Sequence, residues 1–154
     1  MENGASHIER ALTLNPNLAA GWQYSGLLQA YLGNPELAVS NLARAMRLSP
    51  LDTDLYAMQA GSALAEFVAG RYEEAARWAE MALREQPNFF PALRNAATSY
   101  ALAGRLDLSK QAPSRVLQVD PELRISNVPA RVPLRRPDDL ARYQEGLRLA
   151  GLPE

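Results

Sequence analysis

Cysteine is absent from the sequence, and His7 is the single histidine among its 154 residues. The first absence excludes disulfides, thiolate zinc sites and thiol nucleophiles, and the second leaves one imidazole for any catalytic triad. An excess of one charge is also lacking, because 16 basic and 17 acidic residues give a net charge of −1. A chain so close to neutral has no field that attracts DNA or RNA. We therefore expect no metal, no cofactor and no nucleic-acid partner.

Long apolar runs are lacking as well. No stretch approaches the roughly 20 apolar residues of a membrane span, and residues 1–10 do not show the basic-then-apolar pattern of a secretory signal. These absences predict a cytoplasmic protein with no membrane partner.

Paired catalytic carboxylates are lacking too. Glu73-Glu74 and Asp138-Asp139 are adjacent in sequence, and neighbours on a helix do not share a face, so neither pair forms a general acid and base by spacing alone. We expect this chain not to be an enzyme, although a longer parent protein could carry a catalytic domain.

What the sequence does contain is a repeat. Prolines that follow similar helical text stand at spacings of 34, 37 and 34 residues, and glycines echo this at spacings of 37 and 34. Each unit predicts two helices, because good helix formers precede the glycine and an i, i+3, i+4, i+7 apolar pattern follows it. The positions are Pro16, Pro50, Pro87 and Pro121, with Gly33, Gly70 and Gly104.

This pattern resembles the tetratricopeptide repeat, a helix–turn–helix unit of 34 residues. The matching residues, in order, are Trp22, Gly26, Ala38, Leu42, Ala45 and Pro50. The resemblance implies an all-α fold, a right-handed α-α superhelix, over residues 5–121. We divide this solenoid into a half repeat at 5–16 and repeats at 17–50, 51–87 and 88–121.

Three places depart from the repeat. Three extra residues lie between Leu51 and Gln59, and they either lengthen a loop or extend the following helix. Pro113 falls inside a predicted helix, where it either kinks the helix or restarts it. The half repeat is either the cut end of a longer protein or a terminus that self-associates.

Residues 122–154 leave the repeat pattern. Two prolines among apolar residues predict an extended segment from Arg124 to Pro133. A helix then begins near Pro137, and we expect it to cap the last repeat. Six arginines make this tail basic, so they form either a solvated face or a docking patch for an acidic partner: Arg124, Arg131, Arg135, Arg136, Arg142 and Arg148.

In this family the first helix of each repeat lines a concave face that binds peptides, which implies a partner-binding groove here. The groove residues expected from the resemblance are Gln23, Tyr24, Leu27, Tyr31, Leu64, Phe67, Arg94, Asn95 and Thr98. The family's carboxylate clamp is absent, because Leu27 stands where an asparagine is expected. Three polar residues stand at repeat positions where the family normally has apolar side chains. They form either a solvated face or a polar ladder across repeats: Gln29, Glu66 and Tyr100.

The phrases ARAMRLSPLD, AGRYEEA and EGLRLAGLPE resemble the C-terminal repeat region of proteobacterial proteins that carry an upstream adenylate or guanylate cyclase domain, or a winged-helix regulator domain. The resemblance implies an accessory part of a larger bacterial signalling protein. Its function would be protein–protein interaction, with a protein, a peptide or its own upstream domain as partner. The alternative is an oligomerisation region that forms a homodimer through the half repeat.

Overall fold

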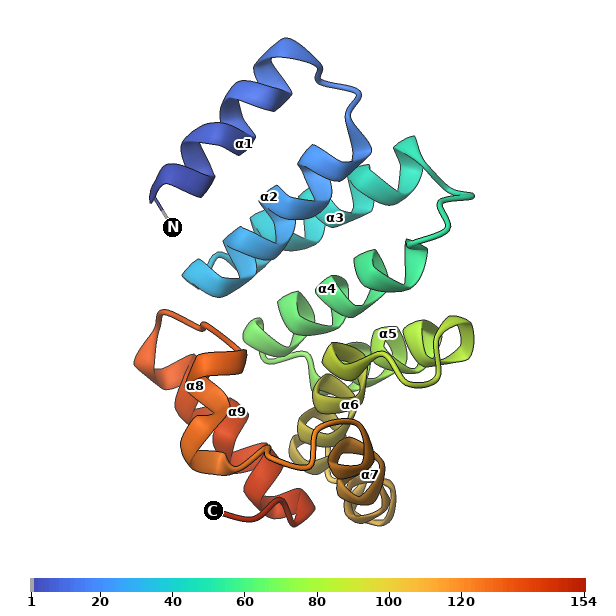
Figure 1. Ribbon diagram of the computed structural model, residues 1–154, viewed down its shortest axis with the longest axis vertical. Helices are drawn as coiled ribbons and strands as arrows, with labels where there is room; N and C mark the ends of the chain where they lie inside the picture. Colours follow the sequence, from blue (N-terminus) through green and yellow to red (C-terminus); the bar gives the residue numbers. More distant parts are fainter. Residues whose placement is uncertain (1) are drawn as a thin grey trace.

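The computed structural model describes residues 2–154, and within that range every regular element is helical. The chain forms a solenoid of antiparallel helix pairs, which confirms the α-α solenoid fold, and α1 stands at one end of it (Figure 1). The elements are α1 (Glu2–Leu14), α2 (Ala19–Leu32), α3 (Pro35–Leu48), α4 (Leu55–Val68), α5 (Tyr72–Glu85), α6 (Phe90–Leu102), α7 (Leu106–Val119), a 3-10 turn η1 (Ile125–Asn127), α8 (Val128–Arg131) and α9 (Pro137–Ala150).

The turns between paired helices follow from the repeating glycines. Gly33 has φ of 82°, and its N–H and that of Asn34 donate to the carbonyls of Ala30 and Gln29. This left-handed conformation satisfies the last carbonyls of α2 at little steric cost only for glycine. Pro35 then opens α3 at a position where no N–H is required. A helix stop and a helix start therefore stand side by side at this turn.

Small residues set the distance between paired helices. A Cβ built on Gly26 of α2 would lie 2.6 Å from Leu42 Cγ and 3.1 Å from the Ala38 carbonyl oxygen of α3. Leu42 and Ala38 are fully buried beneath this contact. The glycine thus allows a close helix approach that a larger residue would prevent.

The three extra residues of the second repeat lie mainly in the loop before its first helix. Residues 49–54 connect α3 to α4, whereas residues 15–18 and 86–89 make the equivalent connections. The longer loop is held by Asp52, whose carboxylate accepts hydrogen bonds from Ser49 Oγ at 3.1 Å and from the Asp54 N–H at 2.8 Å.

Pro113 does not restart its helix. Helix α7 is continuous from Leu106 to Val119, with Pro113 buried inside it. The proline lacks the N–H that would reach the Ser109 carbonyl, and the hydroxyl of Ser109 is buried without a partner. Of the two alternatives for Pro113, the restarted helix is therefore wrong.

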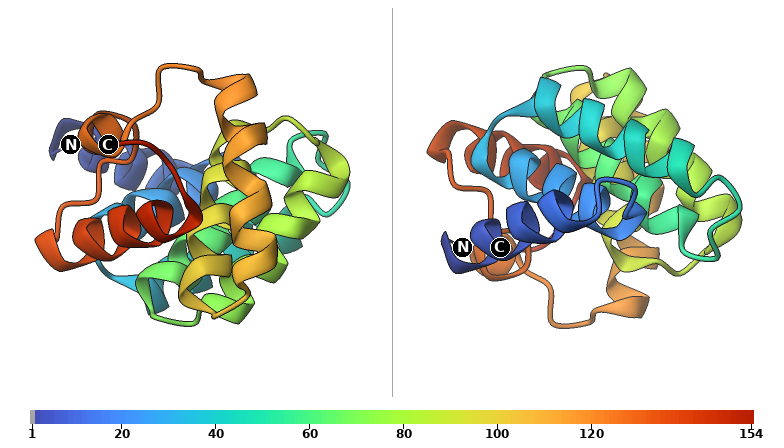
Figure 2. Two further views of the ribbon diagram at one scale, coloured as in Figure 1. Left: turned by 90° about the horizontal axis from the view of Figure 1, so that it is seen from below. Right: turned by 90° about the horizontal axis from the view of Figure 1, so that it is seen from above.

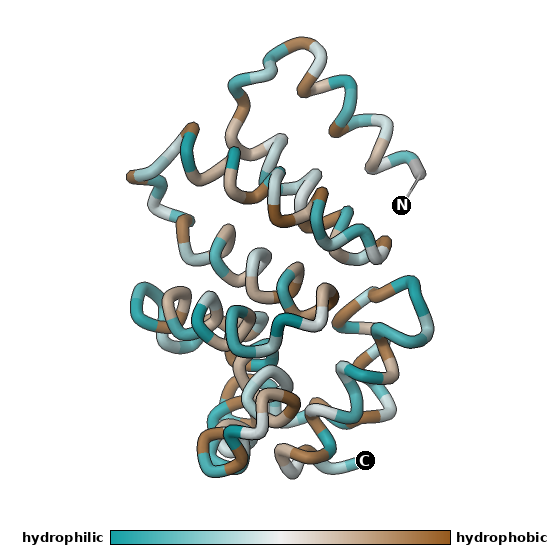
Figure 3. The backbone as a smooth tube through the Cα atoms, turned by 180° about the vertical axis from the view of Figure 1, so that it is seen from behind, coloured by the Kyte–Doolittle hydropathy of each residue, from teal (hydrophilic) through white to brown (hydrophobic). Residues whose placement is uncertain are grey.

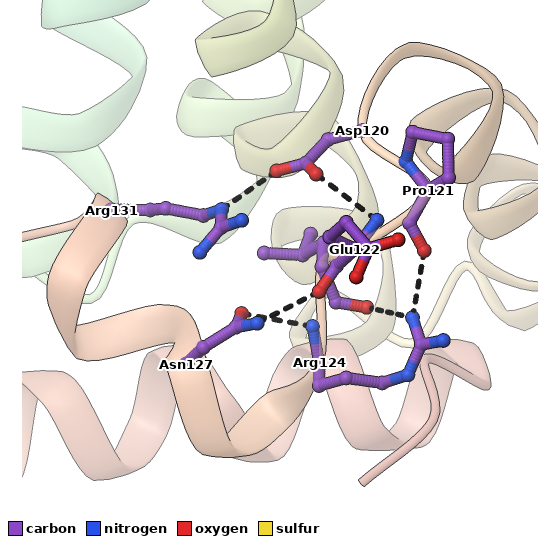
Figure 4. Close-up of polar contacts among 7 residues, drawn as sticks. Asp120, Pro121, Glu122, Arg124, Asn127 and Arg131 are labelled. Carbon is purple, nitrogen blue, oxygen red and sulfur yellow. Dashed lines mark hydrogen bonds and ion pairs between the residues drawn. The ribbon is translucent and has the colours of Figure 1, made fainter.

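The predicted extended segment from Arg124 to Pro133 is also wrong, because η1 and α8 occupy most of it. Pro129 stands in the first turn of α8, where a proline favours a helix start over extended chain. The Asn127 side chain accepts a hydrogen bond from the Arg124 N–H at 2.9 Å and donates to the Glu122 carbonyl at 2.7 Å (Figure 4). These local bonds stabilise the turn.

Helix α9 starts at Pro137, as the sequence predicts, and packs on both helices of the last repeat, more extensively on α6 than on α7. The segment before it runs back along the solenoid towards the end of α2 (Figures 1 and 2). There the Arg135 N–H donates to the Tyr31 carbonyl at 2.8 Å, and Arg136 donates to the Gly33 carbonyl at 3.3 Å. The tail therefore spans the side lined by α2, α4 and α6.

Candidate partner-binding surface

The tail covers part of the predicted groove. The expected groove residues on α4 and α6 are all buried, and α9 lies against this part of the solenoid. They are Leu64, Phe67, Arg94, Asn95 and Thr98. Around Phe67, Asn95 and Thr98, the chain itself therefore occupies the place predicted for a partner.

Tyr143 of α9 is the central contact in this filled part. Its hydroxyl donates to Asn95 Oδ1 at 2.6 Å, and its carbonyl accepts a hydrogen bond from Thr98 Oγ1 at 3.0 Å. Its ring meets Phe67 edge-on, with the ring centres 5.1 Å apart. Burial raises the pKa of Tyr143 to about 12, against an opposing effect of the nearby Arg94.

Arg142 joins α9 to the turn between α4 and α5. Its guanidinium donates to the Val68 carbonyl at 3.0 Å and to the Tyr72 hydroxyl at 2.7 Å. It also pairs with the buried carboxylate of Asp139 at 2.6 Å. This charged contact fixes the N-terminal half of α9 against the second repeat.

The other four predicted groove residues lie on α2, outside the part that α9 fills. Tyr24 is 59% exposed, whereas Gln23, Leu27 and Tyr31 are half-buried. Burial raises the pKa of the Tyr31 hydroxyl above its ordinary value. A hollow of about 410 Å³ opens beside these residues, lined by Gly4, Ile8, Tyr24, Leu27, Leu28, Tyr31 and Pro133.

This hollow is apolar and lies between α1, α2 and the tail. Helix α1 is the outermost element at this end, and hydrophobic and polar residues alternate along it (Figure 3). A smaller hollow of about 120 Å³ continues along α2 and α4 towards Arg94. Ligand and peptide sites are commonly concave and lined mainly by apolar side chains, as the larger hollow is.

Gln29, Glu66 and Tyr100 do not form the predicted ladder. Each bonds to a near partner instead: Gln29 accepts from Asn34 Nδ2 at 2.8 Å, and the Tyr100 hydroxyl donates to Glu80 Oε1 at 2.8 Å. Glu66 pairs with Arg71. The reason is geometric, because the adjacent turn or second helix lies nearer to each side chain than the neighbouring first helix does.

The arginine directly after each of two turn glycines forms an ion pair with the preceding repeat, which the sequence pattern did not predict. Arg71 pairs with Glu36 of the preceding repeat at 2.7 Å, and Arg105 lies 3.8 Å from Glu73 of the repeat before it. The Gly-Arg pairs at 70–71 and 104–105 were the available signal. These arginines stabilise the stacking of successive repeats.

The arginines of the tail are mainly engaged within the chain. Arg131 pairs with Asp120 at 2.6 Å and so lowers the pKa of that carboxyl, and Arg124 donates to the carbonyls of Pro121 and Leu123 (Figure 4). Arg148 pairs with Glu145 and Glu154. These contacts hold the α7–α8 connection and the end of α9 in place.

Among the side chains that the structure describes, no cluster of histidine and acidic residues is placed to hold a metal ion. No helix of the described chain has both the length and the apolar character required to cross a bilayer.

Comparison with protein-family models finds no match, and no curated protein sequence matches this chain. Among solved structures, the fold is similar to that of PilW, described as a widely conserved type IV pilus biogenesis factor. The TM-score is 0.70 over 92% of this chain, at 18% identity, and the match spans 66% of the PilW chain. The likeness concerns the fold alone, and it supports a helical repeat of the tetratricopeptide type.

Proposed function

We propose that this chain is a non-catalytic protein-interaction module that binds a partner polypeptide on the open part of its concave face. The observation that carries the proposal is the apolar hollow of about 410 Å³ beside α1 and α2. Tyr24 stands at this hollow with 59% of its surface exposed, and tyrosine is a common anchor in interfaces. The filled part of the groove acts as a structural support for this open end.

A photo-crosslinking experiment tests the module. The amino acid p-benzoylphenylalanine replaces Tyr24 in one variant, and Leu51, which is 95% exposed in a distant loop, in the matched control. In cells of the source organism we expect a discrete adduct from the Tyr24 position alone. The same adducts from both positions, or none from Tyr24, would contradict the proposal.

We further propose that the module is the C-terminal accessory part of a larger signalling protein and acts on its own upstream domain. The phrases that resemble cyclase-linked and winged-helix-linked repeat regions support this. The reading frame upstream of Met1 is the direct test. A cyclase or winged-helix domain in that frame supports the proposal, and translation that begins at Met1 contradicts it. A cytoplasmic location remains a prediction.

Self-association through the half repeat is the second candidate function. Ile8 and Ala11 of α1 are only half-buried, so this helix retains apolar surface that a second copy could cover. Light scattering across a concentration series separates the two functions. A dimer that Ile8→Asp dissociates supports oligomerisation, and a monomer at all concentrations supports the partner-binding function.

A further inference from the structure

Three charged side chains are buried in the described part of the chain, and two of them have a partner of opposite charge. Glu66 pairs with Arg71, and Asp139 pairs with Arg142. The third is Arg94 of α6, which is 8% exposed and forms no ion pair with any residue from 2 to 154. A buried charge is costly unless an opposite charge or hydrogen bonds compensate it.

The contacts of Arg94 satisfy its guanidinium only in part. The guanidinium carbon lies 4.5 Å from the centre of the Phe90 ring, and the charge lowers the pKa of Tyr143 against the larger effect of burial. Nε is buried and has no hydrogen-bond acceptor. Asp120 also senses this charge weakly, but its carboxylate is paired with Arg131. The guanidinium can therefore still bind an anion.

Arg94 lines the smaller hollow of about 120 Å³, which α2, α4 and α6 form together with Val132 of the tail. The other walls are mainly apolar and include Leu27, Leu64 and Phe89. Among the lining residues that the structure describes, Arg94 alone carries a charge. The hollow therefore combines one positive charge with apolar surface.

Polar groups lie beside Arg94 in this hollow, and they differ in whether they can bind a ligand. The Asn95 side chain is fully used, because it donates to a backbone carbonyl of α4 at 3.0 Å and accepts from the Tyr143 hydroxyl at 2.6 Å. Tyr31 and Gln23 also line the hollow and are half-buried. Burial raises the pKa of Tyr31 and the charge of Arg94 opposes this effect, so these two side chains lie near each other.

The size and the charge of the hollow limit what can bind in it. An engineered apolar cavity of about 150 Å³ holds benzene, so this volume suits roughly four to six non-hydrogen atoms. One guanidinium compensates one negative charge, and its planar N–H groups match the geometry of a carboxylate. The apolar walls favour a hydrocarbon group attached to that carboxylate. A dianion such as sulfate would find no second cation among the described lining residues.

We propose that this hollow binds a carboxylate carried on a short hydrocarbon group, with the Arg94 guanidinium as its counter-charge and the Tyr31 hydroxyl as a further donor. A free short-chain acid and the acidic side chain of a polypeptide share this chemistry. The proposal goes beyond the interaction function and is independent of it, because it concerns the occupant of the hollow at Arg94 and not the apolar hollow at Tyr24.

Proton–nitrogen correlation NMR of the isotope-labelled full chain tests the ligand, with sodium butyrate as the probe. The Nε–H resonance of Arg94 reports on the proposed contact directly, and we expect it to shift saturably as butyrate is added at constant ionic strength. The neutral alcohol n-butanol has a similar size but cannot form the charged contact, and sulfate lacks the hydrocarbon group. Each should bind at least about tenfold more weakly than butyrate.

Variants of the protein test the position of the site. Arg94→Gln removes the charge and should weaken butyrate binding at least about tenfold, whereas Arg84→Gln, at an exposed position of α5, should bind normally. Ala57 lines the hollow and is half-buried, so Ala57→Leu should fill it and block butyrate while Arg94 stays in place. Its matched control is Ala20→Leu, at an exposed position of α2.

A second ligand distinguishes the two sources of the carboxylate. The methylamide of N-acetylglutamic acid carries the glutamate side chain between two blocked peptide groups. Tighter binding of this compound than of butyrate supports the site and assigns its carboxylate to a polypeptide. Equal or weaker binding supports the site and assigns its carboxylate to a free acid.

Four results would overturn the proposal. In the NMR titration, these are an Nε–H resonance of Arg94 that does not respond to butyrate, or one that responds equally to n-butanol. Among the variants, unchanged butyrate affinity of Arg94→Gln would show that the charge is not used, and unchanged affinity of Ala57→Leu would show that the ligand lies elsewhere. A discrete crosslink from the Tyr24 position would still support the interaction module in each case, so the two proposals can fail separately.

Discussion

At the scale of single residues, Gly146 allows α9 to lie close to α6. A Cβ on Gly146 would lie 2.1 Å from Thr98 Oγ1 and 2.8 Å from the Thr98 carbonyl oxygen. The backbone oxygen cannot rotate away, so α9 would have to move. We expect Gly146→Ala to lower the free energy of unfolding by about 1–3 kcal/mol.

Gly4→Ala is the matched control for that substitution. Both glycines are helical, but an added Cβ on Gly4 has open space around it. Alanine should therefore stabilise the chain by at most about 1 kcal/mol through its helix propensity. Urea denaturation measures both variants. Equal effects of the two substitutions would show that the contact with Thr98 does not limit the position of α9.

The buried tyrosine of α9 makes stability depend on alkaline pH. The pKa of Tyr143 is about 12 in the folded chain and 10.0 in its reference state, because burial disfavours the phenolate. The unfolded chain therefore loses this proton first, and the stabilisation is complete below pH 10 and is lost between pH 10 and 12. Tyr31 and Tyr100, whose pKa values burial also raises, act in the same direction.

Urea denaturation at a series of pH values from about 8 to about 12 checks this expectation. Tyr143→Phe should reduce the dependence on pH by one proton while it also removes the hydrogen bond to Asn95 at every pH. A variant with the same slope as the unmodified chain would show that Tyr143 ionises normally and is not enclosed by α6.

At the scale of elements, Arg71 is one of the two arginines that join successive repeats, and it has two unequal partners. The Arg71 side chain pairs with Glu66, which is 10% exposed, and with Glu36, which is 77% exposed. Loss of the arginine leaves a nearly buried carboxylate unpaired, and we expect Arg71→Ala to cost about 1–2 kcal/mol after allowance for solvent screening. Glu36→Ala should cost about 0.5 kcal/mol or less. Thermal unfolding of the two variants measures which substitution lowers stability more. A larger loss for Glu36→Ala than for Arg71→Ala would contradict the prediction.

Helix α1 is the element that should open first. It packs mainly on α2, and a helix of 13 residues is marginal in water without such contacts. Hydrogen exchange followed by mass spectrometry should show faster exchange in residues 3–14 than in residues 58–68, which lie in the buried α4. Equal protection of α1 and α4 in the free chain would contradict this order.

At the scale of the whole molecule, stability does not come from repeat stacking alone. The tail contributes large apolar side chains to the central core, and fully burying each of them is worth about 1.5–3 kcal/mol. These residues are Ile125, Val128, Val132, Tyr143 and Leu147.

Deletion of residues 124–154 should therefore prevent cooperative folding. The sum of those burials is comparable to the whole stability of a typical domain, about 5–15 kcal/mol, and the deletion leaves Phe67 and Thr98 uncovered. Circular dichroism on heating and light scattering are the measurements, with the full chain as reference. A truncated monomer with the same sharp transition would mean that the repeats stand without the tail.

The sequence by itself determined the repeat: the spaced prolines, the glycine turns and the small buried columns are local patterns, and each acts over a short stretch of chain. It also determined where α9 begins and ends, because Pro137 and Gly151 are local signals. It misjudged residues 124–133, where two prolines started a short helix in place of extended chain. Of the two alternatives that it left open for Gln29, Glu66 and Tyr100, the ladder is wrong, because each side chain has a nearer partner.

The contents of the concave face depend on tertiary packing and could not be predicted from local sequence. Asn95, Thr98 and Phe67 have the positions of groove residues, and nothing in their local sequence shows that Tyr143 will cover them. Such contacts join residues 45 and 48 positions apart. They depend on the curvature of the solenoid and on the reach of the tail, which no short pattern encodes. The same long-range geometry leaves a hollow of about 410 Å³ between α1, α2 and the tail.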